Sequence, residues 1–171
     1  MLSQPPISST GDIRLREVTA GDLPLFFEHQ CEPEANRMAA FPARERDAFM
    51  AHWAKILGNE AGTIRTVLFD GQVAGNICSW EQDHRRVVGY WLGKRYWGKG
   101  IATQALAAFL DVVTTRPLYA YVAKHNIGSV RVLEKCGFTM CREETESPDP
   151  PSDGVEEFVF MLGAHKKGES H

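Results

Sequence analysis

The sequence predicts an α/β (α+β) fold, with one domain built on a mixed sheet that carries helices on its faces. The chain has 171 residues and 43% hydrophobic content, which is enough to bury one substantial core. Segments in which apolar and polar residues alternate are interleaved with segments in which apolar residues recur at helical spacing. Asp70-Gly71 stands between two extended segments and is the two-residue signal for a type I′ hairpin, so part of the sheet is antiparallel.

The first part of the chain contains one strand and two helices. Residues 13–16 alternate apolar side chains with arginines, as a half-buried strand does. A helix that Thr19 or Asp22 can cap follows and runs through Phe27. Apolar residues then recur at helical spacing over 49–57, which predicts a second helix that ends at the following Gly-Asn pair.

The later elements continue the alternation of strands and helices. They are hairpin strands at 63–69 and 72–80, a strand at 86–92, a helix at 101–113, a strand at 118–122, a helix beginning at Asn126, an extended stretch at 138–141 and a strand at 158–162. Pro117 limits the helix before it, and Gly137 ends the helix that Asn126 can cap.

Composition and charge bear on the cellular location of the protein, on its partners and on metal binding. The apolar stretches fall short of the ~18 residues that a membrane span needs, and the net charge of −3 argues against a nucleic-acid partner. Four cysteines lie far apart without metal-ligand spacing, which predicts reduced thiols, a cytoplasmic location and no metal site. We expect a flexible leader at 1–11, a single domain at 12–163, a short tail at 164–171, and either a monomer or a homodimer.

Charge is distributed unevenly along the chain. Residues 84–110 include five basic side chains and no carboxylate, whereas residues 142–157 carry seven carboxylates against Arg142 alone. An anionic ligand would suit the first segment and a cationic ligand the second. The acidic run is equally compatible with a solvated loop.

The segment from Val88 to Thr103 predicts an anion-binding site. It contains a strand, a turn with Gly98 and Gly100, and the start of a helix. Glycines let the backbone approach a phosphate, and the free N–H groups and the dipole of a first helical turn favour negative charge. The segment matches neither a Walker loop, because Gly100 follows Lys99, nor a dinucleotide fingerprint. A pyrophosphate would fit, although tight packing of the helix is another reason for the glycines.

Two motifs resemble those of the GNAT superfamily of N-acetyltransferases. The acetyl-CoA signature of that superfamily is Q/R-x-x-G-x-G/A, and residues 97–102 read WGKGIA, with Trp97 in place of Gln or Arg. The run 126–138, NIGSVRVLEKCGF, resembles the N-x-x-S-x-x-V-L-E-K-x-G-F of the branch that acetylates ribosomal-protein N-termini. The resemblance is specific from about Val87 to Phe138.

The resemblance implies a mostly antiparallel sheet of about six to seven strands with helices on both faces. It also implies a V-shaped opening between the fourth and fifth strands that takes the pantetheine arm of acetyl-CoA, the co-substrate. Backbone of Tyr90, Trp91 and Leu92 would hold the arm and the thioester oxygen, and Asn126 would bond the arm from the other side. The pyrophosphate would lie on the amides of Gly98, Lys99, Gly100, Ile101, Ala102 and Thr103. Asn126 has a second interpretation as a helix N-cap, and the two roles can coexist.

The implied reaction is attack of a neutral primary amine on the thioester. The superfamily's usual general acid, a Tyr, is replaced by Leu133, which leaves Ser129 as the candidate acid. A glutamate often found near the start of the fourth strand is replaced by Val87, so the candidate bases are Glu81, Tyr90 and the acidic and imidazole groups at 83 and 84.

The expected acceptor is a peptide or protein N-terminal α-amine or a small-molecule amine. An α-amine, with a pKa of ~7.7 to 8.0, is partly neutral at pH 7, whereas a lysine amine at ~10.4 is almost wholly protonated and needs a stronger base. Because the usual acid and base are missing, a catalytically silent acyl-CoA-binding module is the alternative function. A structural domain without a ligand would require both motifs to be coincidental.

Overall fold

Strands and helices alternate along the chain in the computed structural model, which describes residues 11–141 and 156–163. The strands are β1 (Ile13–Arg16), β2 (Thr63–Phe69), β3 (Gln72–Gln82), β4 (Arg85–Leu92), β5 (Leu118–Ala123), β6 (Thr139–Met140) and β7 (Glu157–Leu162). The helices are α1 (Leu23–Gln30), α2 (Pro33–Ala39), α3 (Arg46–Leu57), α4 (Ile101–Val112) and α5 (Ile127–Lys135), with 3-10 turns η1 (Ala20–Asp22) and η2 (Lys94–Tyr96).

The seven strands form one sheet in the order β1-β2-β3-β4-β5-β7-β6. Neighbouring strands are antiparallel except for β4 and β5, which run parallel. The mixed, mostly antiparallel sheet is therefore confirmed. The expected leader up to residue 10 and the expected tail at 164–171 lie outside the described residues, and the domain boundaries stay a prediction.

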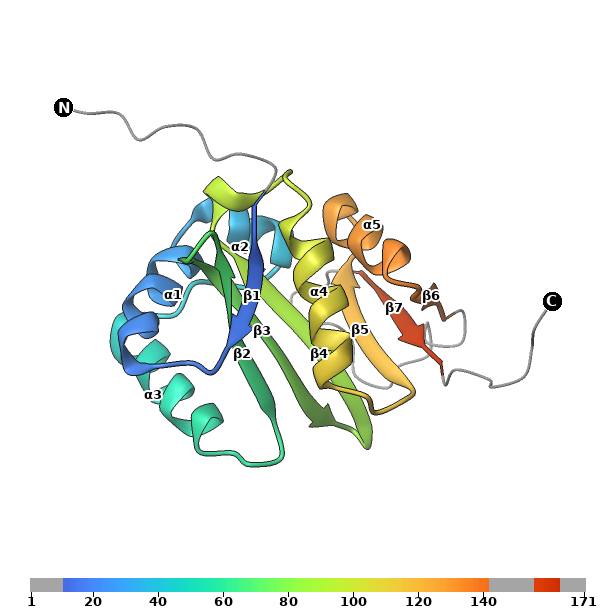
Figure 1. Cartoon of the computed structure of the whole chain (residues 1–171), viewed down its shortest axis with the longest axis horizontal. Helices are drawn as coiled ribbons and strands as arrows, with labels where there is room; N and C mark the ends of the chain where they lie inside the picture. The colour runs from blue at the N-terminus through green and yellow to red at the C-terminus, as the bar shows by residue number, and fades with distance from the viewer. Residues whose placement is uncertain (1–10, 142–155, 164–171) are drawn as a thin grey trace.

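Two apolar clusters cover opposite faces of the sheet. On β3, Ile77 belongs to the larger cluster, which includes buried residues of α4 and α5, and Cys78 packs in the smaller cluster with α1 and α3. Successive side chains of a strand point to opposite faces, so we call these the α4 face and the α1 face. Figure 1 shows α4 crossing the sheet between β1 and β5. Helix α2 contacts α1 and β5, which extends the α1 face toward β5.

Strands β4 and β5 separate toward their carboxyl ends. Their parallel pairing ends where Val87 faces Tyr119, although β4 continues to Leu92 and β5 to Ala123. This separation is the V-shaped opening that the family resemblance implies between the fourth and fifth strands. Backbone groups on its inner edges are left for a ligand, because no neighbouring strand pairs with them there.

The predicted strands and helices are confirmed, with bounds that shift by a few residues. Asp70 and Gly71 have φ of 49° and 80°, as a type I′ turn requires. The sequence analysis misses α2, a seven-residue helix too short for a repeated apolar pattern, although Pro33 in its first turn is a helix-start signal. It also misses the tight turn between β3 and β4, where Asp83 and His84 adopt positive φ without a glycine.

Candidate active site

The V-shaped opening presents different side chains to the two faces of the sheet. Tyr90 of β4 packs against the core on the α4 face. Its neighbour Trp91 points to the α1 face, where the indole N–H donates to the carbonyl oxygen of His29 at 3.2 Å. A ligand that threads the opening would therefore meet the α4 and α5 elements on one side and α1 with α2 on the other.

The turn between β4 and α4 leaves a row of backbone amides without partners. Gly98 and Gly100 have φ of 72° and 77°, a left-handed conformation that glycine adopts at little cost. Gly100 is the N-cap of α4 and supplies no side-chain cap. Within residues 11–141 and 156–163, no group accepts a hydrogen bond from the amides of residues 98–103.

The space above these amides is open. A Cβ on Gly98 would meet no atom within 4 Å, and a Cβ on Gly100 would meet only the side-chain nitrogen of Gln104 at 3.9 Å. Close packing of the helix therefore explains neither glycine. An anion on the turn needs both the left-handed backbone and the free space, and the dipole of the 12-residue α4 favours negative charge there. The turn thus fits a pyrophosphate.

The side chains of the turn divide between the core and the surface. Ile101 is buried and Ala102 packs partly against the same core, so both can contact a ligand mainly through their backbone. The carbonyl oxygen of Thr103 accepts a weak hydrogen bond from Cys136 Sγ at 3.5 Å, which joins α4 to α5. Lys99 has no carboxylate partner among the described residues, which leaves its charge available for an anionic ligand.

Trp97 connects the turn to the end of β4. Its indole N–H donates to the carbonyl oxygen of Leu92 at 3.1 Å, and its ring packs against the core. The superfamily's Gln or Arg is thus replaced here by a side chain that braces the turn. The Leu92 carbonyl oxygen is thus engaged by Trp97, and the contacts of the Tyr90, Trp91 and Leu92 backbone with the arm stay a prediction.

Asn126 and Ser129 lie at the start of α5. The side-chain oxygen of Asn126 accepts a hydrogen bond from the backbone N–H of Ser129 at 3.2 Å, so the predicted N-cap is confirmed. The amide nitrogen of Asn126 has no partner in the described part of the chain and can still donate to a ligand. Capping and ligand binding are therefore compatible at this residue.

The hydroxyl groups of Tyr90 and Ser129 are 2.6 Å apart, and their hydrogen bond joins β4 to α5 on the α4 face of the opening. Burial raises the pKa of the Tyr90 phenol to about 12. The phenol is therefore neutral at pH 7 and can donate to Ser129 Oγ. The hydrogen of the Ser129 hydroxyl is then free to point at another acceptor.

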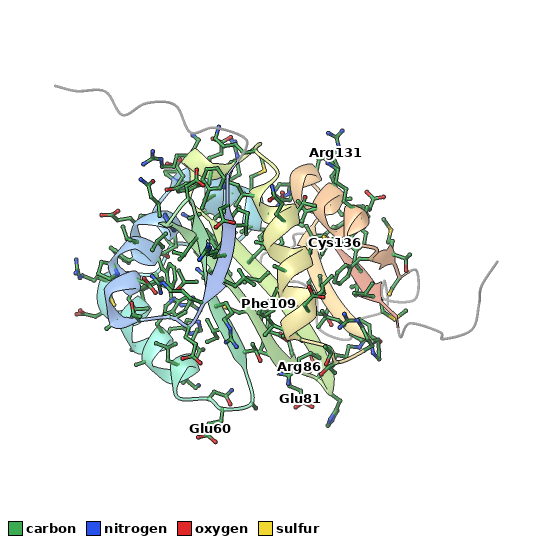
Figure 2. All side chains as sticks on the ribbon, viewed as in Figure 1. Glu60, Glu81, Arg86, Phe109, Arg131 and Cys136 are labelled. Carbon is green, nitrogen blue, oxygen red and sulfur yellow. The ribbon has the colours of Figure 1, made fainter. Side chains whose placement is uncertain are left out.

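The structure does not bring Glu81 to this hydroxyl pair. Glu81 lies on β3 opposite Arg86, beside the end of the sheet where β4 and β5 still pair. Figure 2 shows Glu81 and Arg86 together at one end of the molecule, far from Cys136, which follows α5. The candidates at 83 and 84 form the turn beyond Glu81, and Tyr90 is the candidate base that the opening contains.

The residues that replace the superfamily's usual acid and base are core residues. Leu133 is 2% exposed and Val87 is 1% exposed. Neither position leaves room for water around an ionised group, and such a group would be costly there without a partner. The candidate acid and base of this chain therefore stand at other positions.

Helix α2 bridges the open end of the V on the α1 face. Lys94, just after β4, forms an ion pair with Glu34 at 2.7 Å. His125, just after β5, contacts the carbonyl oxygen of Arg37 through Nε2 at 2.6 Å. Sequence reasoning misses this bridge because its contacts join segments that are distant along the chain.

Of the acidic run, the structure describes Glu156 and Glu157, and the other carboxylates lie outside the described residues. The four cysteines are free. No group of His, Cys, Asp or Glu within residues 11–141 and 156–163 could hold a metal ion. The described helices are all too short or too polar to cross a membrane.

Solved structures share this fold. A spermidine N-acetyltransferase from Vibrio cholerae in complex with CoA and spermine has a TM-score of 0.74 and 18% identity, over 88% of this chain and 95% of that chain. RimL, a ribosomal L7/L12 alpha-N-protein acetyltransferase in complex with coenzyme A, has a TM-score of 0.71 and 18% identity, over 93% and 97%. An acetyltransferase from Agrobacterium tumefaciens has a TM-score of 0.72 and 20% identity, over 97% of each chain.

No curated protein sequence is a significant match to the chain. The family described as the acetyltransferase (GNAT) domain matches residues 12–139, which include the turn between β4 and α4 and the start of α5. The chain therefore belongs to the GNAT acetyltransferases, which are acyl-CoA-dependent N-acetyltransferases.

Proposed function

We propose that this protein transfers the acetyl group of acetyl-CoA to a primary amine, either a peptide or protein N-terminal α-amine or the amine of a small molecule. One observation carries the proposal. The free amides of residues 98–103 flank the same opening that the hydroxyl pair of Tyr90 and Ser129 crosses. The first feature suits a pyrophosphate, and the second offers a proton donor beside the opening.

The proposed contacts with acetyl-CoA follow the course of the opening. The amides of residues 98–103 would hold the pyrophosphate, with Lys99 adding positive charge. Backbone of Tyr90 and Trp91 and the Leu92 amide would hold the arm and the thioester oxygen. Asn126 would donate to the arm from the α5 side. No metal takes part in this proposal.

Acetyl-CoA supplies an activated acyl group, and this chain supplies the surrounding donors. As the C–N bond forms and the C–S bond breaks, negative charge builds on the carbonyl oxygen and then on sulfur. Backbone N–H groups of β4 would stabilise the charge on oxygen. The hydroxyl of Ser129 would give its proton to sulfur while Ser129 Oγ accepts a hydrogen bond from Tyr90.

Two considerations bear on the acceptor. The run 126–138 resembles the branch that acetylates ribosomal-protein N-termini, which supports an α-amine. The fold is equally similar to that of a spermidine N-acetyltransferase, which supports a small amine. An α-amine is easier to use because a larger fraction of it is neutral at pH 7.

Two measurements test this function. Acetyl-CoA at a hundred times its Kd should stabilise the folded protein by about 2.7 kcal/mol, which a thermal melt detects. Thiol release should then be measured with a panel of alanine- and serine-initiated peptides, spermidine, an aminoglycoside and lysine, with mass spectrometry of the product. Binding without turnover on any amine would make the protein an acyl-CoA-binding module instead. No shift in melting temperature and no binding by calorimetry would refute the assignment of acetyl-CoA.

A further inference from the structure

We propose that Glu157 is the general base that takes the proton of the acceptor amine through bridging water. The inference rests on the proposed acetyl transfer. It fills the role that Glu81 cannot fill from the far end of β3.

The strand register places Glu157 beside the open end of the V. Glu157 opens β7 and faces Ala123, the last residue of β5. Counting forward from the last β4–β5 pair, Val87 with Tyr119, puts Trp91 level with Ala123 across the opening. Paired strands lie about 4.8 Å apart, and β4 and β5 diverge here, so the Glu157 backbone is more than roughly 10 Å from the β4 backbone that would hold the thioester. A glutamate side chain together with bridging water molecules can span that gap.

Side-chain alternation places Glu157 on the α1 face. Phe158 and Phe160 pack with the core on the α4 face, so their neighbour Glu157 points the other way. The pyrophosphate turn, α4 and α5 occupy the α4 face. An amine acceptor therefore has to reach the thioester from the α1 face, where α2 bridges the ends of β4 and β5 and where Trp91 and Glu157 lie on the two sides of the opening.

The carboxylate of Glu157 has no hydrogen-bond or ion-pair partner among the described residues. Three basic side chains at the ends of β5 and α2 are engaged with other groups: Lys124 with Glu156 at 3.0 Å and over the Phe158 ring at 5.3 Å, His125 with the Arg37 carbonyl oxygen, and the Arg37 guanidinium with Glu34 at 3.5 Å. Burial raises the pKa of the Glu157 carboxyl, which makes it a stronger proton acceptor than an ordinary glutamate.

The proton balance of the reaction is complete with this residue. The amine nitrogen forms the C–N bond and passes its proton to Glu157. The C–S bond breaks, and Ser129 gives its proton to the departing sulfur. Solvent then removes the proton from Glu157 and restores that of Ser129, so that the protein returns to its starting state.

The chain offers a matched pair of variants. Glu157→Gln removes the base with little change of shape, and Glu156→Gln removes the adjacent carboxylate, whose exposed ion pair with Lys124 contributes little. With the panel amine that the wild type acetylates fastest, Glu157→Gln should lower kcat/KM at pH 7 about a hundredfold or more. Glu156→Gln should stay within about threefold of the wild type, and the acetyl-CoA Kd should be unchanged in both.

The pH profile separates loss of a base from loss of structure. The defect of Glu157→Gln should shrink between pH 7 and pH 9, because the neutral fraction of the amine rises without help from the protein. Its melting temperature at pH 7 should stay close to that of the wild type, because an exposed carboxylate without a partner is replaced by a neutral amide of the same shape.

Three results would overturn the inference. They are a Glu157→Gln variant within about threefold of the wild type, an equal loss in both glutamine variants, or a defect that stays constant up to pH 9. Each of these requires a wild type that acetylates an amine. A wild type that releases no thiol with any amine of the panel would refute the proposed function itself, and the role of Glu157 with it.

Discussion

Removal of the Ser129 hydroxyl should affect stability and turnover in different proportions. Ser129→Ala leaves the largely buried Tyr90 phenol without the partner that lies 2.6 Å away. An unsatisfied buried polar group costs about 1 to 3 kcal/mol. Tyr90→Phe leaves only the Ser129 hydroxyl, which is partly exposed and can bond to water, so the cost should be about 0.5 to 1.5 kcal/mol. Ser129→Ala should therefore be the less stable variant.

In free-energy terms, the loss of turnover should exceed the loss of folding stability. If Ser129 protonates the departing sulfur, Ser129→Ala should lower the single-turnover rate by roughly ten- to a thousandfold, equivalent to about 1.4 to 4 kcal/mol of activation free energy. Tyr90→Phe keeps the serine proton and loses its orientation, so the rate should fall about tenfold. The Kd of acetyl-CoA should change little in either, because the proton matters only as charge builds on sulfur.

Three measurements on the two variants and their double mutant separate the roles of Ser129 and Tyr90 in stability and in turnover. They are urea unfolding, calorimetry with acetyl-CoA, and single-turnover thiol release. The double mutant should be no slower than Ser129→Ala, since the two hydroxyls act as one unit. Near-normal single-turnover rates in Ser129→Ala would remove this residue from the mechanism. A larger loss in Tyr90→Phe than in Ser129→Ala would make the tyrosine the proton donor and the serine its support.

Three further predictions concern the scaffold and the turn. Asp22→Ala should lower the free energy of unfolding by about 2 to 3 kcal/mol, because the buried carboxylate accepts hydrogen bonds from the partly exposed Arg16 at 2.7 and 2.8 Å. This pairing with Arg16 holds the pKa of Asp22 well below its usual ~3.9. The difference in free energy of unfolding between the wild type and Asp22→Ala, measured with urea, should therefore be largest above pH ~4 and should decrease as the pH falls further. Ala102→Glu should abolish the thermal shift with acetyl-CoA while far-UV circular dichroism stays native, because it puts a carboxylate beside the amides meant for phosphate; an unchanged shift would contradict the assignment. His84→Gly should raise the free energy of unfolding by about 0.5 to 1 kcal/mol, because it relieves a non-glycine residue at φ 66°, and a loss of stability would contradict this.

The backbone of the turn proposed to bind an anion could be predicted because contiguous sequence encodes it. The turn at 98–103 needs only the left-handed preference of glycine and the start of a helix, both of which are local properties. The Asn126 cap likewise involves a residue only three positions away. The element order and the mixed sheet follow from periodicity and from one turn signal at Asp70-Gly71.

The acceptor side could not be predicted, because it depends on strand register and on a short helix. Helix α2 is held by contacts of Lys94 and His125, which follow different strands, and neither residue carries a sequence signal for that role. The partner of Ser129 likewise depends on the packing of α5 against β4. Glu157 is one carboxylate among seven in an acidic run, and its register with Ala123 has no signal in the sequence.

A base on β7 also accounts for the loss of the glutamate on β4. Val87 stands at the last paired position of β4 and β5 and is 1% exposed, so an ionised carboxylate there would be desolvated without a partner. Glu157 faces the open end of the V, where solvent can remove the proton after each turnover. The proposed acid and base then lie on opposite faces of the sheet, with Ser129 on the sulfur side and Glu157 on the amine side. This separation stops the serine proton from passing directly to the carboxylate, so that each group can act on its own end of the reacting bonds.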